Sequence, residues 1–213
     1  MRVRWHGHAC FEFGNSEHTV VIDPHDGKSL GIKPPAATAD VVLMTHSHYD
    51  HKAAWVIGGN HKDFLSVNGP FEFENLSFRG FSTFHDEKSG RERGLNTMYS
   101  FVMDNISVCH CGDLGCIPEP EIISQIKGTD ILFIPVGEVY TMSMQNVRRF
   151  IELINPNIIV PMHYRVGGLT LPIGTIDAFL EMIPEKYVDY VGNEIDITRE
   201  DLTEMKECWI FER

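Results

Sequence analysis

The sequence predicts a single α/β domain over residues 1–213, in which packed β-sheets are covered by helices. Strand and tight-turn signals fill the first half of the chain, whereas strand–helix units fill the second half. No linker rich in Pro, Gly and Ser separates the halves, and 213 residues fit one large domain at roughly 100–200 residues per domain.

The predicted strands of the first half alternate in polarity or run apolar between turn residues. Gly7 and the turn Gly14-Asn15-Ser16 separate the first three strands. Two later pairs flank Glu74-Asn75 and Asp104-Asn105, which is typical of hairpins. The predicted strands of this half cover residues 2–5, 9–13, 19–23, 40–44, 71–74, 76–82, 99–103 and 106–110.

Helical spacing appears in the second half. Val147, Phe150, Ile151 and Ile154 fall on one face of a predicted amphipathic helix over residues 143–154. Further helices are expected over residues 121–127 and 175–183, and a helix-like stretch over residues 52–57. The intervening strands are expected over residues 130–135, 158–161, 186–191 and 207–211.

Composition narrows the function classes. The net charge of −12 repels phosphate backbones, so nucleic acid is not an expected partner. The N-terminal segment alternates instead of forming an apolar signal sequence, and no stretch approaches the ~20 apolar residues of a membrane span. We therefore expect a cytoplasmic protein that does not bind membranes. No helix pattern specifies an interface, so the sequence leaves homo-oligomerisation open.

The segment THSHYDH places three histidines and an aspartate within six positions, directly after a predicted buried strand. Imidazole and carboxylate are ligands of transition metals. At a strand end, His46 and His48 face the same way, whereas on a helix they would point about 200° apart. Asp50 and His51 lie beyond the strand and approach from another side. The spacing therefore predicts two adjacent metal ions.

Other ligands are expected at other strand ends, where functional groups sit on a rigid scaffold. His85, Asp113 and His163 each follow a predicted strand. His110 competes with His85 for the role of third histidine. Alternatively, His110 holds a ligand through its other ring nitrogen.

Two further groups of residues are candidates for supporting roles. His8 and Asp23 follow early strands and either contact the ligands from behind or are purely structural. Arg93, Tyr164 and Arg165 lie beside proposed ligands in the sequence. They either bind a substrate phosphate or carboxylate or form part of the solvated surface.

The whole pattern resembles the metallo-β-lactamase superfamily. The HxHxDH signature is complete, and a later His, Asp and His follow in the family's order, so that the resemblance spans about residues 3–165. Within the superfamily the chain resembles the UlaG-like branch, whose named member is an L-ascorbate 6-phosphate lactonase. That similarity rests on WHGHACF near the N-terminus, on Ile22-Asp23-Pro24, and on His85-Asp86 followed by Arg93-Gly94-Leu95-Asn96.

The resemblance implies an αββα four-layer sandwich, with two mixed β-sheets packed face to face, helices outside and the site at one edge. It also implies two divalent metal ions per chain, with zinc expected first and manganese or iron as alternatives. Flavodiiron relatives carry glutamate in place of His48, which favours hydrolysis over redox chemistry here. The implied ligands are His46, His48 and His85 for one ion, Asp50, His51 and His163 for the other, and Asp113 between them.

These features predict a metal-dependent hydrolase that uses a metal-bound hydroxide on a small anionic ester, lactone or phosphodiester. Asp50 would orient the hydroxide and pass on its proton, and Asp113 would bridge the ions. The alternatives are a ribonuclease Z-like nuclease and a non-catalytic metal-binding protein. The net charge and the lack of a basic, Gly-rich arm oppose the nuclease.

Overall fold

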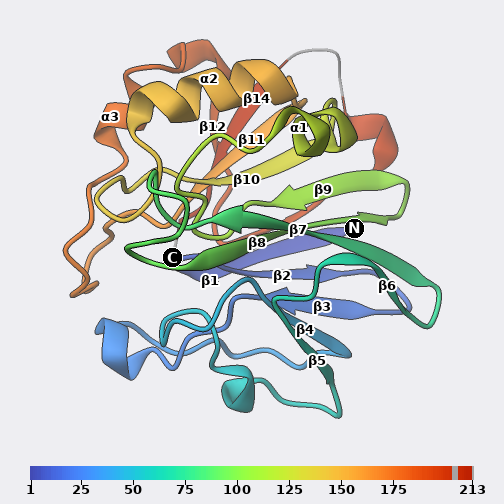
Figure 1. The fold of residues 1–213 in the computed structure, drawn as a ribbon. Coiled ribbons are helices and arrows are strands. Elements are labelled where there is room, and N and C mark those ends of the chain that lie inside the picture. Colours follow the sequence, from blue (N-terminus) through green and yellow to red (C-terminus); the bar gives the residue numbers. More distant parts are fainter. Residues whose placement is uncertain (203–205, 213) are drawn as a thin grey trace.

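The computed structural model describes residues 1–202 and 206–212. Two mixed β-sheets pack face to face, and helices α1 and α2 cover the outer side of the larger sheet (Figure 1). This arrangement confirms the predicted α/β sandwich. The α-helices are α1 (Pro120–Ile126), α2 (Met144–Ile154) and α3 (Asp177–Leu180).

The smaller sheet is antiparallel on one side and parallel on the other, because β1, β2 and β3 form a meander and β4 and β5 add in parallel to β3. Its strands, in spatial order, are β13 (Glu194–Asp196), β1 (Arg2–Gly7), β2 (Cys10–Gly14), β3 (Thr19–Ile22), β4 (Val41–Met44) and β5 (Lys62–Leu65).

The larger sheet begins as antiparallel hairpins and continues as parallel strands from β9 onward. Its strands, in spatial order, are β12 (Val188–Tyr190), β14 (Glu207–Ile210), β11 (Ile158–Met162), β10 (Ile131–Pro135), β9 (Ile106–His110), β8 (Leu95–Met103), β7 (Leu76–Phe84) and β6 (Gly69–Phe73).

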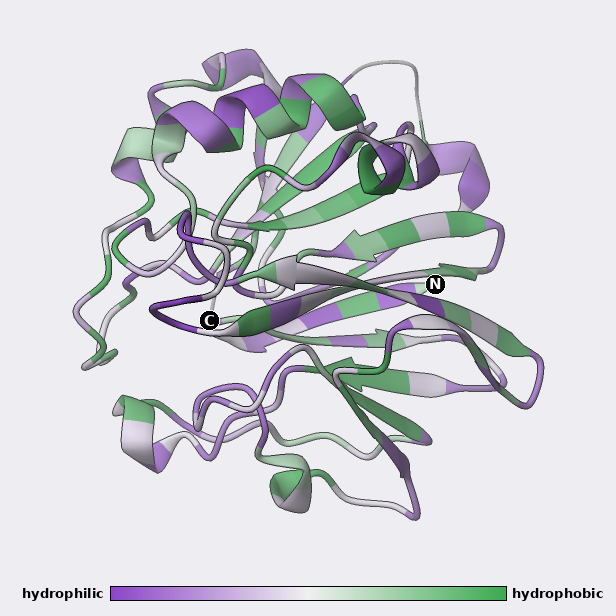
Figure 2. Cartoon of the chain, in the orientation of Figure 1, coloured by the Kyte–Doolittle hydropathy of each residue, from purple (hydrophilic) through white to green (hydrophobic). Residues whose placement is uncertain are grey.

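The main core lies between the sheets and follows from the period of two along the strands. Phe11 and Phe13 of β2 point inward, and the Phe11 ring lies 4.6 Å from the ring of Phe133 on β10. Figure 2 shows apolar and polar residues alternating along the hairpin strands, whereas β10 and β11 are almost continuously apolar. The latter pattern is typical of parallel strands buried on both faces.

The outer side of the smaller sheet differs from the predicted helical layer. There, a separate apolar cluster that includes Val42 and Met44 is covered by a loop carrying Ala54 and Ile57. The predicted helix over residues 52–57 is only a 3₁₀ turn, η2 (Ala54–Val56), and the adjoining loop contains η1 (Lys28–Leu30). Only some residues of this segment contact the sheet, because Ala54 and Ile57 are buried whereas Lys52 and Trp55 are exposed.

Three other elements differ from the sequence prediction. Strands β5 and β13 were not predicted, and the third helix is shorter than residues 175–183. The remaining turns are η3 (Glu185–Tyr187) and η4 (Arg199–Asp201). Within the described residues, no helix combines the length and apolarity that crossing a membrane requires.

Strand direction brings the predicted ligand loops to one edge. Strands β1, β3 and β4 of the smaller sheet run the same way, because β1 and β3 are both antiparallel to β2 and β4 is parallel to β3. In the larger sheet, β7 and β9 are both antiparallel to β8, and β10 and β11 are parallel to β9. The carboxyl ends of these strands form one rim.

Candidate metal centre

The rim carries the seven side chains that the sequence predicts as ligands. The THSHYDH segment follows β4, His85 follows β7, Asp113 follows β9 by three residues, and His163 follows β11. All are buried except His48, which is half-buried.

Asp113 lies at the centre of the cluster. Its Oδ2 atom lies 3.1 Å from His85 Nε2, 3.2 Å from His163 Nε2, 3.3 Å from His51 Nε2 and 3.8 Å from His46 Nε2. These histidines come from three separate parts of the chain, because His46 and His51 both belong to the THSHYDH segment. One carboxylate oxygen thus faces nitrogens from both halves of the predicted site.

The potential ligand atoms fall into three overlapping groups, in each of which they lie within 4.8 Å of one another. The first group consists of the three ligands predicted for the first ion. The second consists of the ligands predicted for the second ion, with His8 added. The third combines one histidine of each of these groups with Asp113. The groups are His46, His48 and His85; His8, Asp50, His51 and His163; and His46, His51 and Asp113.

The chemistry of these donors fits divalent cations. Within the described part of the chain, His46 Nε2, His51 Nε2 and Asp113 Oδ1 are buried without a hydrogen-bond partner. Buried polar atoms without partners are costly in a folded protein. The two imidazole nitrogens lie 3.8 Å and 3.3 Å from Asp113 Oδ2 at the centre of the cluster, so a cation bound there would satisfy them. A mixed set of imidazole and carboxylate ligands suits zinc, manganese or iron.

A buried carboxylate orients two of the histidines. Asp23 Oδ2 accepts hydrogen bonds from His51 Nδ1 at 2.9 Å and from Thr45 Oγ1 at 2.8 Å. Thr45 Oγ1 also lies 2.9 Å from His46 Nδ1. On the opposite side, His85 Nδ1 donates to the Tyr140 carbonyl oxygen at 3.0 Å. Each contact leaves Nε2 of the histidine facing the cluster, as an outer partner of a metal ligand does.

Asp113 is positioned by its backbone. Its N–H donates to Asn96 Oδ1 at 2.9 Å, and Asn96 in turn donates to the Cys111 carbonyl oxygen at 2.8 Å. The preceding Gly112 has a φ of 55°, and a Cβ atom there would lie 2.4 Å from Asn96 Oδ1 and 2.7 Å from Thr45 Cβ. Glycine at this position therefore lets the loop approach β8 and the ligand turn closely.

The electrostatics of the cluster favour anionic carboxylates. Burial alone would raise the pKa of Asp113, but His163, His51 and His85 outweigh burial and hold it well below its ordinary range. Burial opposes charging of His51 as well, but the carboxylates of Asp113 and Asp50 raise its pKa well above its ordinary range. Positive charge is thus stabilised at the position where a cation would bind.

Imidazoles with fewer acidic neighbours stay neutral. Burial, with the nearby His51 charge, lowers the pKa of His46 to about 3. Burial, with His163, lowers the pKa of His8 to about 3. A neutral imidazole offers a lone pair, which is the form that binds a metal ion.

His8 lies in the site rather than in a purely structural position. Its Nε2 atom is 3.2 Å from Asp50 Oδ2, and its ring centroid is 4.3 Å from that of His163. His8, Asp23 and His163 all have left-handed backbones, with φ of 56°, 52° and 53°. This conformation is uncommon outside glycine and is often found at functional sites.

His110 takes neither of the two roles considered for it, because it contacts backbone groups and no proposed ligand side chain among the described residues. Its Nε2 atom donates to the Ala9 carbonyl oxygen at 3.0 Å, so its Nδ1 atom accepts from Gly112 N–H at 3.2 Å. Both ring nitrogens are therefore engaged with backbone. By contrast, His85 presents Nε2 to Asp113, and the geometry favours His85 over His110 as the third histidine.

A cavity of about 360 Å³ opens onto the cluster. It is lined by all five predicted ligands other than His46 and His51, and by Arg93, Tyr49, Tyr140 and Leu171. Thr45, Asn96 and Tyr140 take part in the site without having been predicted as site residues. The only signal for Tyr140 was its place in the loop after β10.

The other two predicted substrate residues lie elsewhere. Tyr164 is buried, its ring centroid lies 5.9 Å from that of Trp5, and its hydroxyl donates to the Phe211 carbonyl oxygen at 3.5 Å. Arg165 is exposed, and neither residue lines the metal cavity. Both residues follow His163, whose backbone is left-handed, and proximity in sequence to this ligand did not predict their positions.

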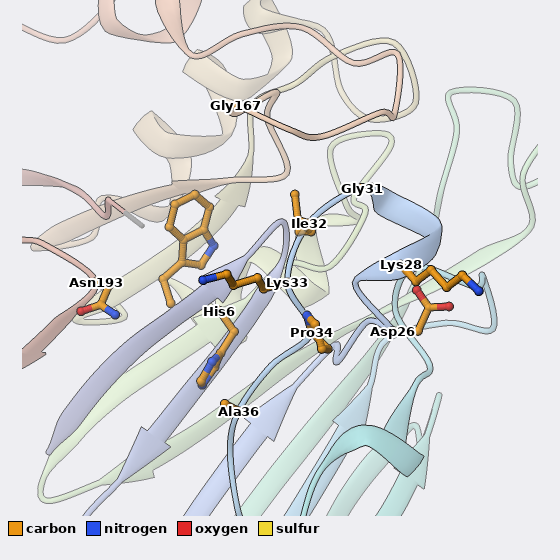
Figure 3. A pocket seen from close by; sticks show the side chains of 11 residues that line it. His6, Asp26, Lys28, Gly31, Ile32, Lys33, Pro34, Ala36, Gly167 and Asn193 are labelled. Atoms are coloured by element: carbon orange, nitrogen blue, oxygen red, sulfur yellow. The ribbon is translucent and has the colours of Figure 1, made fainter.

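A larger cavity of about 920 Å³ lies between β1 and the loop that contains η1. Figure 3 shows Lys33 and His6 at this cavity, with Asn193 on its far side. None of the seven clustered ligands lines it. The candidate functional cavity is therefore identified by the potential metal ligands that line it and not by its volume.

The model of a family described as a β-lactamase superfamily domain matches residues 2–163. The chain is 30% identical over 194 residues to a UPF0173 metal-dependent hydrolase from Thermoplasma acidophilum, covering 79% of this chain and 85% of that protein. It is 26% identical over 219 residues to UPF0173 metal-dependent hydrolase YtkL from Bacillus subtilis, covering 89% and 92%.

A solved structure from Thermotoga maritima, provisionally named a Zn-dependent hydrolase of the metallo-β-lactamase superfamily, superposes with a TM-score of 0.81. It is 29% identical in sequence, and the match covers 99% of this chain and 98% of that one. The similarity extends over the whole sandwich, including the rim that carries the cluster.

Proposed function

The chain belongs to the family of β-lactamase superfamily domains, and from this premise we propose that its rim cluster binds two divalent ions and hydrolyses a small anionic substrate. The chain is a metal-dependent hydrolase of this superfamily, as its relatives are named. Zinc is the first expected metal, with manganese or iron as alternatives. The substrate is an ester, a lactone or a phosphodiester, and the UlaG-like resemblance draws attention to lactones. The expected location is the cytoplasm.

One observation carries the proposal. Asp113 Oδ2 lies within 3.1–3.8 Å of four histidine Nε2 atoms, and two of those nitrogens, of His46 and His51, are buried without a hydrogen-bond partner among the described residues. A buried carboxylate surrounded by imidazole nitrogens, two of them without a hydrogen-bond partner, is an arrangement that a pair of bridged cations would stabilise. Asp113 would bridge, with His46, His48 and His85 on one side and Asp50, His51 and His163 on the other.

Bound divalent ions lower the pKa of water to about 7 and polarise the carbonyl or phosphoryl oxygen of a substrate. The chain's own residues supply the remaining functions. Asp50 lines the cavity and its Oδ2 atom is held by His8 Nε2, so its carboxylate is oriented to accept the proton of the attacking water. Asp50 then passes this proton to the leaving group.

The cavity supports a small substrate. A volume of about 360 Å³ is near the lower end of the roughly 300–1,000 Å³ found for small-molecule sites. The apolar side chain of Leu171 and the aromatic rings of Tyr49 and Tyr140 form part of its walls. These groups exclude water from one side of the substrate, while the ligand cluster forms the other.

The test combines metal analysis with a substrate screen. Protein purified without chelator is analysed for elemental content and assayed against lactones, phosphodiesters and carboxylic esters. We expect two ions per chain and turnover of at least one class, with turnover lost in Asp113→Ala. Turnover that persists in Asp113→Ala, or a wild-type protein that retains two ions and hydrolyses none of these classes, would contradict the proposal.

A further inference from the structure

The loop after β7 is built around one buried carboxylate. Asp86, next to His85, accepts hydrogen bonds from the backbone N–H groups of Lys88, Gly90, Glu92 and Arg93 at 2.7–3.0 Å. Four bonds to one side chain fix the course of the loop. They therefore fix the position from which Arg93 extends toward the metal cavity.

The Arg93 side chain ends on an aromatic ring. Its Cζ atom lies 4.0 Å from the centroid of the Tyr140 ring, and both residues line the cavity that contains His85 and Asp113. A guanidinium over a ring face is held by cation–π attraction. Among the described residues, the Arg93 guanidinium makes no hydrogen bond or ion pair, so its five N–H donors are available.

Tyr140 is itself fixed relative to the ligands. Its carbonyl oxygen accepts the hydrogen bond from His85 Nδ1, and its loop is tied at Met142, whose N–H donates to the Leu114 carbonyl oxygen at 3.0 Å. The preceding Glu138 and Val139 have φ of 49° and 44°. A β-branched residue in this conformation is strained, which indicates that the loop is held in place by its surroundings.

Charge explains why an unpaired arginine matters here. Two divalent ions would carry about four positive charges, and a hydroxide nucleophile with the buried carboxylates of Asp23, Asp50 and Asp113 would carry about four negative ones. The metal centre alone is then nearly neutral. In a chain with a net charge of −12, the attraction of an anionic substrate requires a separate cation, and Arg93 provides it at the cavity wall.

We propose that Arg93, held on the Tyr140 ring, binds a second oxyanion group of the substrate, a carboxylate or a phosphate that is distinct from the bond cleaved at the metal centre. The planar guanidinium matches such a group with two parallel N–H donors. This proposal rests on the proposed hydrolase function and specifies its substrate class. The substrate carries its anionic group at a distance from the scissile bond.

The test uses matched substrate pairs that differ only in the distal group. The carboxylate pair is mono-para-nitrophenyl succinate and para-nitrophenyl butyrate, and the phosphate pair is a sugar lactone with and without a phosphomonoester on its side chain. For each protein the ratio of kcat/KM between the anionic and the neutral member is measured, together with bound metal. The pair with the larger ratio identifies which oxyanion Arg93 binds.

We expect the wild-type ratio to favour the anionic member and to fall roughly 10- to 150-fold in Arg93→Met. Arg93→Lys keeps the positive charge but loses the two parallel N–H donors, so its ratio should lie between those of wild type and Arg93→Met. Tyr140→Phe keeps the ring and should keep the ratio, whereas Tyr140→Leu should lower it. Arg91→Met is the matched control, because Arg91 is exposed on the same loop and contacts the Lys88 carbonyl oxygen.

An equal ratio in wild type, Arg93→Met and Arg91→Met, with metal retained, would overturn this proposal while leaving the hydrolase function intact. If the wild-type protein hydrolyses none of these substrates, the hydrolase function is instead overturned. In that case calorimetric binding of inorganic phosphate to the zinc-loaded protein decides the role of Arg93. A dissociation constant that rises at least 10-fold in Arg93→Met but not in Arg91→Met supports it, and equal constants refute it.

Discussion

Replacing Asp23 by Asn should weaken metal binding through a residue that touches no metal. The carboxylate accepts three hydrogen bonds, from His51 Nδ1 at 2.9 Å, from Thr45 Oγ1 at 2.8 Å and from Thr45 N at 2.7 Å. An asparagine keeps one carbonyl oxygen but turns an NH₂ group toward the remaining donors. His51 then loses the acceptor that fixes its tautomer, and its Nε2 lone pair is no longer reliably directed at the cluster.

The size of the effect follows from these contacts. Loss of an outer partner of a ligating histidine costs about 10- to 100-fold in metal affinity, which is about 1.4–2.8 kcal/mol. Each charge-assisted hydrogen bond that is lost costs about 1.5–3 kcal/mol of folding stability. With one or two such bonds lost, Asp23→Asn should destabilise the metal-free protein by about 1.5–6 kcal/mol.

The assay is competition for zinc between the protein and a chromophoric chelator, with thermal unfolding of the metal-free protein in parallel. Asp63→Asn is the matched control, because it removes the same charge from an exposed position on β5. The control should keep both affinity and stability. Zinc binding by Asp23→Asn that equals the control would refute the view that Asp23 orients His51 for metal binding.

Three further predictions follow from the structure. His85→Gln should reduce the bound metal per chain, whereas His110→Gln should retain two ions at lower stability, as elemental analysis and thermal unfolding would show; the reverse pattern would exchange their roles. An ion whose free concentration is 100 times its Kd adds about 2.7 kcal/mol to the free energy of unfolding, so adding chelator should lower Tm by roughly 5–10 °C for each ion removed. An unchanged Tm would contradict metal binding to the native state. Burial would raise the pKa of Glu12, but His6 and Arg2 outweigh it and lower the pKa below 4.5. The ionised Glu12 carboxylate stabilises the fold above pH 4.5, and this stabilisation is lost as pH falls through the lowered pKa. The Tm of Glu12→Gln should therefore be below that of wild type at neutral pH and equal to it in acid. A difference in Tm that does not depend on pH would count against the ion pair.

The fold was predictable where the pattern of buried residues was strong. The hairpin strand β7 and the amphipathic helix α2 lie close to where periodicity placed them, whereas β8 begins at Leu95, before the predicted start at Tyr99. Strands β5 and β13 were missed because they are short edge strands with mostly polar, exposed residues. The sequence signal of a strand comes mainly from its buried face, and these strands have little of one.

The proximity of the proposed ligands was predictable because each follows a strand, and parallel strands bring their ends to one edge. Backbone conformation was not predictable. His8 and His163, whose side chains lie in the site, both have a left-handed φ, and Tyr164, which follows His163, does not line the cavity. Since non-glycine residues rarely adopt this conformation, nothing in the local sequence indicated it. The pairing of Arg93 with Tyr140 joins two distant loops and needed the structure.

The central claim is that Asp113 bridges two metal ions at the rim of the sandwich. A crystal structure of the zinc-loaded protein, with anomalous scattering recorded at the zinc edge, tests it most directly. The account predicts two peaks, one against His46, His48 and His85 and the other against Asp50, His51 and His163, with Asp113 contacting both. A single peak, or two peaks without contact to Asp113, would contradict it.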